Sequence, residues 1–126
     1  MLNFRQFEAG PDPFGRKFQV YLKWLQTAIS IRHADTVDVK FALVDDHDTH
    51  TEKTIALPHA DLLAVSREIG RAVDDPWCSR LAALHLTYLV ESGEDLEKDL
   101  VTVLPSDLRR HATALARMEQ AEVGAR

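Results

Sequence analysis

Residues 51–65 read Thr51-Glu-Lys-Thr-Ile-Ala-Leu-Pro58-His-Ala-Asp-Leu-Leu-Ala-Val65, and the spacing of their apolar side chains changes at Pro58. Before the proline, apolar and polar residues alternate with a period of two, which is typical of a strand with one buried face. After it, apolar residues recur every three or four positions, as on an amphipathic helix. Proline suits a helix start because the first backbone N–H groups have no partner within the helix. The stretch therefore predicts a strand followed by a helix.

Alternation with a period of two also extends upstream of this stretch. The clearest strand is predicted over Val37–Leu43, where every second residue is apolar. An earlier strand is predicted over Phe18–Trp24, with Trp24 on its apolar face. Ala28–His33 continues the alternating pattern up to a short polar turn, so these segments are predicted to form an antiparallel hairpin.

Helical spacing dominates after Pro58. A first helix carries an apolar stripe between Leu62 and Val73. A second is predicted from Pro76 to Glu91, because an aspartate cap precedes its first-turn proline and a glycine follows its end. Leu84–Val90 also alternates, so a strand within this segment is left open.

The remaining segments are shorter or less regular. Leu100–Leu104 is rich in branched aliphatic residues and predicts an added strand. A last helix is predicted to begin at Ser106 or Asp107. Residues 1–15 contain turn-forming glycine and prolines and predict an irregular N-terminal arm, and residues 121–126 predict a frayed tail.

The order of these segments predicts the fold class. We expect a single α+β domain over residues 1–126, built as an antiparallel β-meander of about four to five strands with three C-terminal helices packed on one face. A chain of this length buries enough apolar surface to fold without disulfides or structural metals.

Cysteine use and hydropathy bear on the compartment. Cys78 is the only cysteine, so no intrachain disulfide can form, and a reducing environment suits the chain. The N-terminus lacks the pattern of a signal peptide, and no apolar run has the length needed to span a bilayer. We therefore expect a cytoplasmic protein with no membrane partner. Cys78 itself is interpreted as a small buried residue, because no activating motif accompanies it.

Charge and motifs disfavour several classes of function. The net charge is −5, whereas non-specific nucleic-acid binding needs a cluster of cations, so nucleic acid is disfavoured as a partner. The dispersed glycines form no phosphate-binding loop, and neither a nucleophile elbow nor a zinc-binding helix occurs. The sequence therefore indicates no cofactor and favours a protein that is not an enzyme.

A polar loop offers a weak metal-site hypothesis. Asp46, His47, Asp48 and His50 bring carboxylates and imidazoles together between two predicted strands. The spacing matches neither a structural zinc site nor a calcium-binding loop. We therefore interpret the segment as a solvated hairpin loop and keep divalent metal binding as the alternative.

Three residues are candidates for a ligand pocket between sheet and helices. His85 lies one position away from the apolar stripe of the second helix, and Tyr88 belongs to that stripe. Trp24, on the apolar face of a predicted strand, is the third residue that could face a ligand in such a pocket. Because no catalytic partner accompanies His85 at a fixed spacing, a hydrogen-bonded packing histidine is the simpler interpretation.

A complete core pattern without chemically active residues favours an interaction role. We expect a non-enzymatic cytoplasmic protein-interaction module that binds itself as a homodimer or binds another protein. Assembly would use a sheet edge, the outer sheet face or the phenylalanine-bearing arm. The alternative is a small-ligand-binding protein, or an enzyme, with a pocket between sheet and helices.

Overall fold

The computed structural model describes residues 3–28 and 35–124. Its elements are, in chain order, β1 (Gln6–Ala9), β2 (Phe18–Ala28), β3 (Thr36–Val44), β4 (His50–Pro58), α1 (His59–Ile69), α2 (Asp75–Ser92), β5 (Leu100–Thr102) and α3 (Pro105–Gly124). The part of the strand predicted over Ala28–His33 that follows Ala28 lies outside the described residues.

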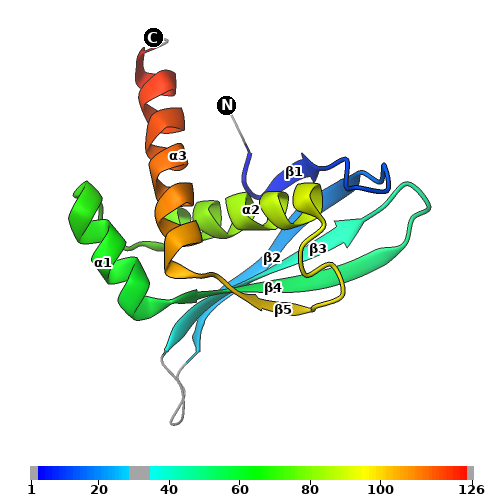
Figure 1. The fold of residues 1–126 in the computed structure, drawn as a ribbon, viewed down its shortest axis with the longest axis horizontal. Coiled ribbons are helices and arrows are strands. Elements are labelled where there is room, and N and C mark those ends of the chain that lie inside the picture. The colour runs from blue at the N-terminus through cyan, green and yellow to red at the C-terminus, as the bar shows by residue number, and fades with distance from the viewer. Residues whose placement is uncertain (1–2, 29–34, 125–126) are drawn as a thin grey trace.

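The five strands form one sheet in the order β1-β2-β3-β4-β5 (Figure 1). The first four strands are antiparallel neighbours in a meander. β5 pairs in parallel with β4, from Thr54 opposite Leu100 to Ala56 opposite Thr102. A parallel neighbour needs a long crossover connection, which α1 and α2 provide here. The structure confirms the predicted α+β fold, and it adds a parallel fifth strand to the meander.

A bulge in β2 changes which residues face the core. The pairing with β3 shifts by one residue between Leu22 and Trp24, so Lys23 is the extra residue. Leu25 consequently takes the inner position, while Trp24 lies opposite Lys40 on the outer face of the sheet. The prediction that Trp24 belongs to the apolar face of this strand is therefore wrong. Past the bulge, the residues that continue the alternating pattern point to the opposite face of the sheet.

The N-terminal arm is more regular than its composition suggests. Its residues Gln6–Ala9 form β1 and pair with Phe18–Tyr21, so the prediction of a wholly irregular arm is wrong. The aromatic ring of Phe7 meets that of Phe41 edge to face, with ring centroids 6.2 Å apart. This contact anchors β1 to the core and outweighs the turn-forming residues that follow it.

The second helix is the central element of the helical layer. It begins after Asp74, whose carboxylate accepts a hydrogen bond from the backbone N–H of Trp77 at 2.9 Å, and it stops at Gly93, which has a left-handed φ of 78°. α2 packs against β1, β3 and β4 on one side and against α3 on the other. Leu84–Val90 lies within this helix, so the alternative of a strand there is excluded.

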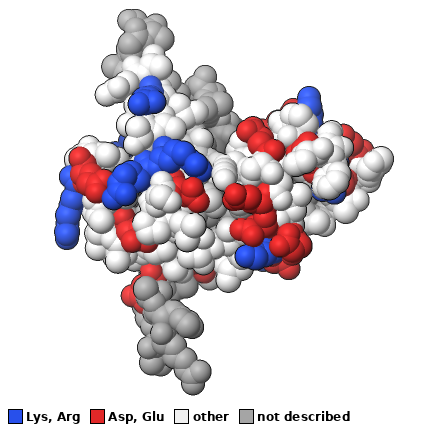
Figure 2. All heavy atoms as spheres, in the orientation of Figure 1, with Lys and Arg blue, Asp and Glu red and all other residues white. Residues whose placement is uncertain are grey.

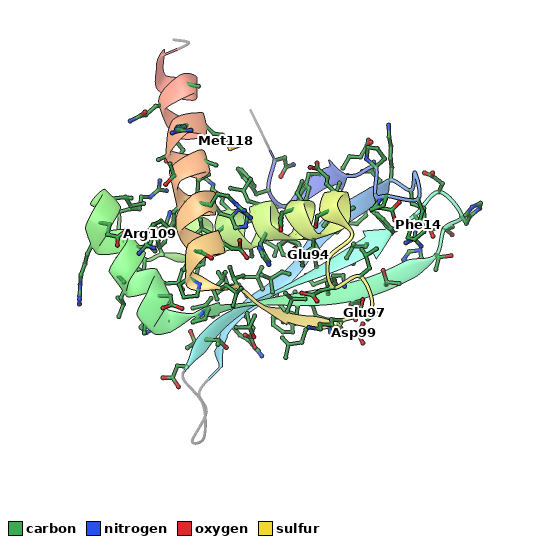
Figure 3. All side chains as sticks on the ribbon, in the orientation of Figure 1. Phe14, Glu94, Glu97, Asp99, Arg109 and Met118 are labelled. Atoms are coloured by element: carbon green, nitrogen blue, oxygen red, sulfur yellow. The ribbon has the colours of Figure 1, made fainter. Side chains whose placement is uncertain are left out.

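The third helix rises away from the sheet and packs on the other two helices (Figure 1). Arg109 reaches from α3 towards α1, where its Nε and Nη2 each donate to a carboxylate oxygen of Glu68 at 2.9 Å (Figure 3). The helix continues to Gly124, so residues 121–124 of the tail predicted to fray belong to α3.

The space between sheet and helices is filled with apolar side chains. Fully buried residues from both layers meet there, including Val39, Phe41, Ile55 and Leu57 from the sheet and Trp77, Leu81, Leu86 and Leu89 from α2. Burial of side chains of this size stabilises the fold by about 2 kcal/mol each. The described core is therefore a packed layer and not the wall of a ligand cavity.

Candidate functional site

A groove of about 810 Å³ lies at the rim of the sheet, beside β2. Its walls come from residues 3–5 of the N-terminal arm, residues 22–25 of β2 and the first two turns of α2. These segments are far apart in the sequence, and the pairing of β1 with β2 brings the first two together. The groove therefore exists only in the folded chain.

One wall of the groove is a strand edge without a partner strand. The last described pair between β1 and β2 is Gln6 opposite Tyr21, and one further hydrogen bond joins the N–H of Leu22 to the carbonyl of Arg5 at 2.8 Å. Beyond it no described strand pairs with Lys23–Thr27 on this side, whereas β3 covers the other side. We call Lys23–Thr27 the open edge. β2 extends well past the end of β1 in Figure 1.

A local turn explains why β1 stops here. The side-chain Oδ1 of Asn3 accepts hydrogen bonds from the backbone N–H groups of Arg5 at 3.0 Å and Gln6 at 3.3 Å. Such a turn bends the chain away from the strand direction. Phe4 is half-buried, and the guanidinium of Arg80 lies over its ring, 5.7 Å from the centroid. The arm is thus tied to α2 instead of continuing along β2.

The groove is basic, although the chain as a whole is acidic. Its lining contains the three cations Arg5, Lys23 and Arg80 and the single carboxylate Asp75. The lining charge is therefore +3 − 1 = +2, compared with −5 for the whole chain. On the face seen in Figure 2, acidic side chains gather instead around the loop between α2 and β5.

The ion pairs of these cations leave positive charge in excess. Lys23 lies 3.6 Å from Glu52, which also pairs with Lys40 at 3.2 Å. One carboxylate therefore serves two lysines on the outer face. Contact with both ammonium groups lowers the pKa of Glu52, with the Lys40 hydrogen bond as the largest cause.

The same arrangement recurs on the helix side of the groove. Glu119 lies 3.5 Å from Arg80 and also accepts a hydrogen bond from Arg71. Two guanidinium groups again share one carboxylate. The side chain of Arg5 makes no ion pair with any described residue, so it is free to meet a charged ligand.

Trp24 supplies an aromatic surface at the open edge. Its side chain is 38% exposed, which is high for a tryptophan. The Nζ of Lys40 lies over the ring at 5.6 Å from its centroid and holds the ring against the outer face. Tryptophan in such a position is typical of protein-binding surfaces.

The structure brings His85 and Tyr88 together, but it places Trp24 on the opposite face of the sheet. The Nδ1 atom of His85 lies 2.9 Å from the Nε2 atom of His111, and both rings are buried between α2 and α3. The ring of Tyr88 stacks on that of His85, with centroids 5.8 Å apart. The three predicted ligand-binding residues therefore do not share one pocket.

Burial keeps this histidine pair neutral. Desolvation, the nearby ring of His85 and the charge of Arg110 lower the pKa of His111 to about 4. Desolvation likewise lowers the pKa of His85. Tyr88 donates its hydroxyl proton to Glu94 at 3.0 Å, a contact that raises the pKa of the tyrosine. With both rings neutral near pH 7 and no nucleophile beside them, the pair acts as a hydrogen-bonded link between two helices.

The polar loop before β4 is held by its own hydrogen bonds. The Oδ1 atom of Asp45 accepts from the backbone N–H groups of His47 and Thr49, both at 2.9 Å. His50 Nε2 lies 3.2 Å from Asp48 Oδ1, and both residues are exposed. Within residues 3–28 and 35–124, no three His, Cys, Asp or Glu side chains are arranged to hold a metal ion. Metal binding by Asp46, His47, Asp48 and His50 thus stays a hypothesis without geometric support.

Cys78 lies in the first turn of α2, facing the core. Burial, followed by the charges of Asp75 and Asp74, raises the pKa of its thiol to about 12. The interpretation of Cys78 as a small buried residue is confirmed.

Sequence reasoning missed several residues that now matter. The signal for His111 was present, because it falls between Leu108 and Leu115 at helical spacing on the buried side of α3. Arg5 and Arg80 offered no such signal. They line the same groove only because β1 pairs with β2 and α2 packs beside them.

Comparisons with protein-family models, with curated proteins and with solved structures find no match to this chain. Among the described residues, no helix is both long enough and apolar enough to cross a membrane.

Proposed function

We propose that this protein is a non-enzymatic interaction module that binds an extended segment of a partner protein at the open edge of β2. The observation that supports this most directly is the unpaired run Lys23–Thr27, which opens into a groove with an exposed tryptophan. Exposed edges of this kind accept an added strand, whose backbone provides affinity while the neighbouring pockets provide specificity.

The dimensions of the edge suit a short linear segment. Five extended residues span roughly 17 Å, so an added strand of about five residues would fill the edge. Each backbone hydrogen bond contributes about 1 kcal/mol net, and side-chain burial in the groove contributes the rest. We expect a modest, reversible affinity, as is usual for small peptide-binding modules.

The alternative of a small-ligand protein with a pocket between the layers has less support. The sheet and α2 meet through fully buried side chains, and the histidine pair is buried and neutral. A hollow of about 480 Å³ beside His111 is lined by residues of α2 and α3 alone, so it does not lie between the sheet and the helices, where this alternative places its pocket.

Selection of linear peptides from a random displayed library tests the proposed site. The matched pair of variants is Trp24→Ser and Tyr21→Ser, because both aromatic side chains are 38% exposed on the outer face of β2. Tyr21 lies where β1 covers the strand, whereas Trp24 lines the groove. We expect Trp24→Ser to weaken the selected peptides by about tenfold, consistent with loss of an interface aromatic residue. Tyr21→Ser should leave affinity within about twofold.

Hydrogen exchange locates the bound peptide. We expect slower amide exchange in residues 23–27 on peptide binding, because backbone groups gain partners there. Failure to select any linear peptide, or protection confined to another part of the chain, would contradict the proposed function.

A further inference from the structure

We infer that the segment received by the open edge is acidic and belongs to a different protein, rather than to a second copy of this chain. This inference rests on the proposed function and specifies the chemistry of the partner. Charge complementarity supports it. The groove lining carries a charge of +2, set by Arg5, Lys23 and Arg80 against Asp75, on a chain whose total charge is −5. Opposite charges across an interface steer association and exclude wrong partners.

The cations lie on both sides of the position that an added strand would take. Lys23 points to the outer face, because its Nζ reaches Glu52 there. Arg80 approaches from α2 on the helix side, where its guanidinium covers Phe4. Successive side chains of a strand point to opposite faces, so an acidic residue on either face of the added strand would lie near a cation.

The existing carboxylates do not neutralise this site. Glu52 is shared between Lys23 and Lys40, and Glu119 between Arg80 and Arg71. Arg5, at the point where β1 ends, has no ion-pair partner among the described residues. Additional carboxylates therefore gain Coulomb energy here, while lysine or arginine side chains would be repelled.

Apolar contacts complete the surface. Phe4, Leu25 and Pro76 also line the groove, and Phe4 and Leu25 are only partly buried. An apolar side chain between acidic ones would remove this surface from water. The preferred segment therefore alternates acidic and apolar residues.

The same features oppose pairing between two copies. A two-fold contact through the open edge would place two basic linings across one five-residue seam. The bulge at Lys23 also interrupts the regular backbone ladder that an identical edge would need. Homodimerisation, which the sequence led us to expect, is therefore disfavoured at this edge.

Four synthetic octapeptides test the inference against the unmodified full chain. The acidic probe alternates glutamate with valine, and the basic and neutral probes replace glutamate by lysine or serine. The fourth probe is the acidic peptide N-methylated at every residue, so that neither of its edges can donate backbone hydrogen bonds. All carry blocked ends and a neutral dye for anisotropy. We expect the acidic probe to bind at least tenfold more tightly than the basic and neutral probes. Binding should weaken several-fold between about 50 and about 300 mM NaCl, because salt screens the charges.

Charge-reversed variants identify the residues involved. The double variant Arg5→Glu with Lys23→Glu should weaken the acidic probe by at least tenfold. The control Arg117→Glu alters an exposed arginine of α3 that does not line the groove and should change affinity by less than twofold. Circular dichroism confirms that each variant folds.

Each of the other outcomes contradicts the inference, the proposed function or both. Equal binding of the neutral and acidic probes overturns the acidic specificity but leaves the proposed function standing. Full binding of the N-methylated probe shows that no strand is added and overturns both. If no probe binds, and sedimentation shows dimers that the Trp24→Ser substitution dissociates, a second copy of the chain occupies the edge. That result overturns the inference but not the proposed function. Absence of binding with a monomeric chain overturns both.

Discussion

The two edges of the sheet differ in how far the outermost strand covers its neighbour. At the β5 edge, the N–H of Thr54 donates to the carbonyl of Asp99 at 2.7 Å, and the N–H of Val103 donates to Ala56 at 2.9 Å. Asp99 before β5 and Val103 after it thus extend the coverage of β4 beyond the three residues of β5. At the opposite edge, β1 ends at Gln6 and leaves the second half of β2 uncovered.

A buried lysine fixes the loop that precedes β5. The Nζ of Lys53 donates to the carbonyl oxygens of Asp95 at 3.0 Å, Leu96 at 3.1 Å and Lys98. Desolvation lowers the pKa of Lys53, whereas Asp99, Glu97 and Asp95 act in the opposite direction. Figure 3 shows Glu97 and Asp99 on this loop. One edge is therefore acidic and held by an internal cation, while the other is basic and lacks an internal partner. β5 is the last strand of the sheet and also lacks a described partner on its outer side, but it is only three residues long, and so short an edge strand offers little to an added strand.

The largest loss of stability is expected from replacing Lys53, which fixes the loop before β5. Replacement by methionine keeps the aliphatic stem but leaves three carbonyl acceptors without their donor. We expect a loss of about 3 kcal/mol in the free energy of unfolding, because unsatisfied buried polar groups are costly. Urea denaturation measures this loss. Lys40→Met is the control. A loss below about 0.5 kcal/mol for Lys53→Met would show that the loop before β5 keeps its place without the lysine.

A smaller loss of stability is expected at acidic pH, which acts on the buried histidine pair between α2 and α3. The pKa of His111 is about 4 in the folded chain and about 6.5 in the unfolded chain. Its contribution to the free energy of unfolding is therefore fully present above pH 6.5. It is lost as the pH falls from about 6.5 to about 4, because the unfolded chain then binds more protons. We expect a loss of about 2 kcal/mol, which is less than the full shift because partial solvent contact screens the charge.

Unfolding curves measured at several pH values test this linkage. The double variant His85→Gln with His111→Gln should show little change in stability between about pH 6.5 and pH 5. The acidic groups with lowered pKa values, such as Asp12 and Glu68, act at lower pH and do not obscure this window. A wild-type chain with constant stability over this range would contradict the buried pair.

The smallest effect on stability is expected at the open edge. Arg5→Glu changes an exposed side chain without an ion-pair partner among the described residues, so the free energy of unfolding should change by no more than about 0.5 kcal/mol. Thermal and urea unfolding check this value. A large loss of stability would assign Arg5 a structural role and weaken the distinction between the two edges.

Much of the fold could be predicted because it is encoded locally. The change of period at Pro58 predicted where β4 gives way to α1, and Asp74 and Gly93 predicted the ends of α2 through capping chemistry. Burial of His85 also followed from its place beside an apolar stripe. Each of these features depends on residues within one or two helical turns of one another.

The candidate site could be predicted only in part. Trp24 was selected for a pocket facing the helices, but the bulge at Lys23 turned it to the outer face. A single inserted residue leaves no clear trace in an alternating pattern, because the strand remains alternating on both sides of it. The other site residues, Arg5 and Arg80, come from separate elements and had no shared signal.

The sequence by itself determined the types and order of most elements, the apolar faces of β3, β4 and the helices, and the absence of disulfides, because these depend on composition and short-range periodicity. Only the tertiary structure decided that β1 ends before β2 does, that β5 joins β4 in parallel, and that a basic groove opens in an acidic protein. The physical reason is that strand pairing and helix docking join distant residues, and the free energy of those contacts depends on the whole folded chain.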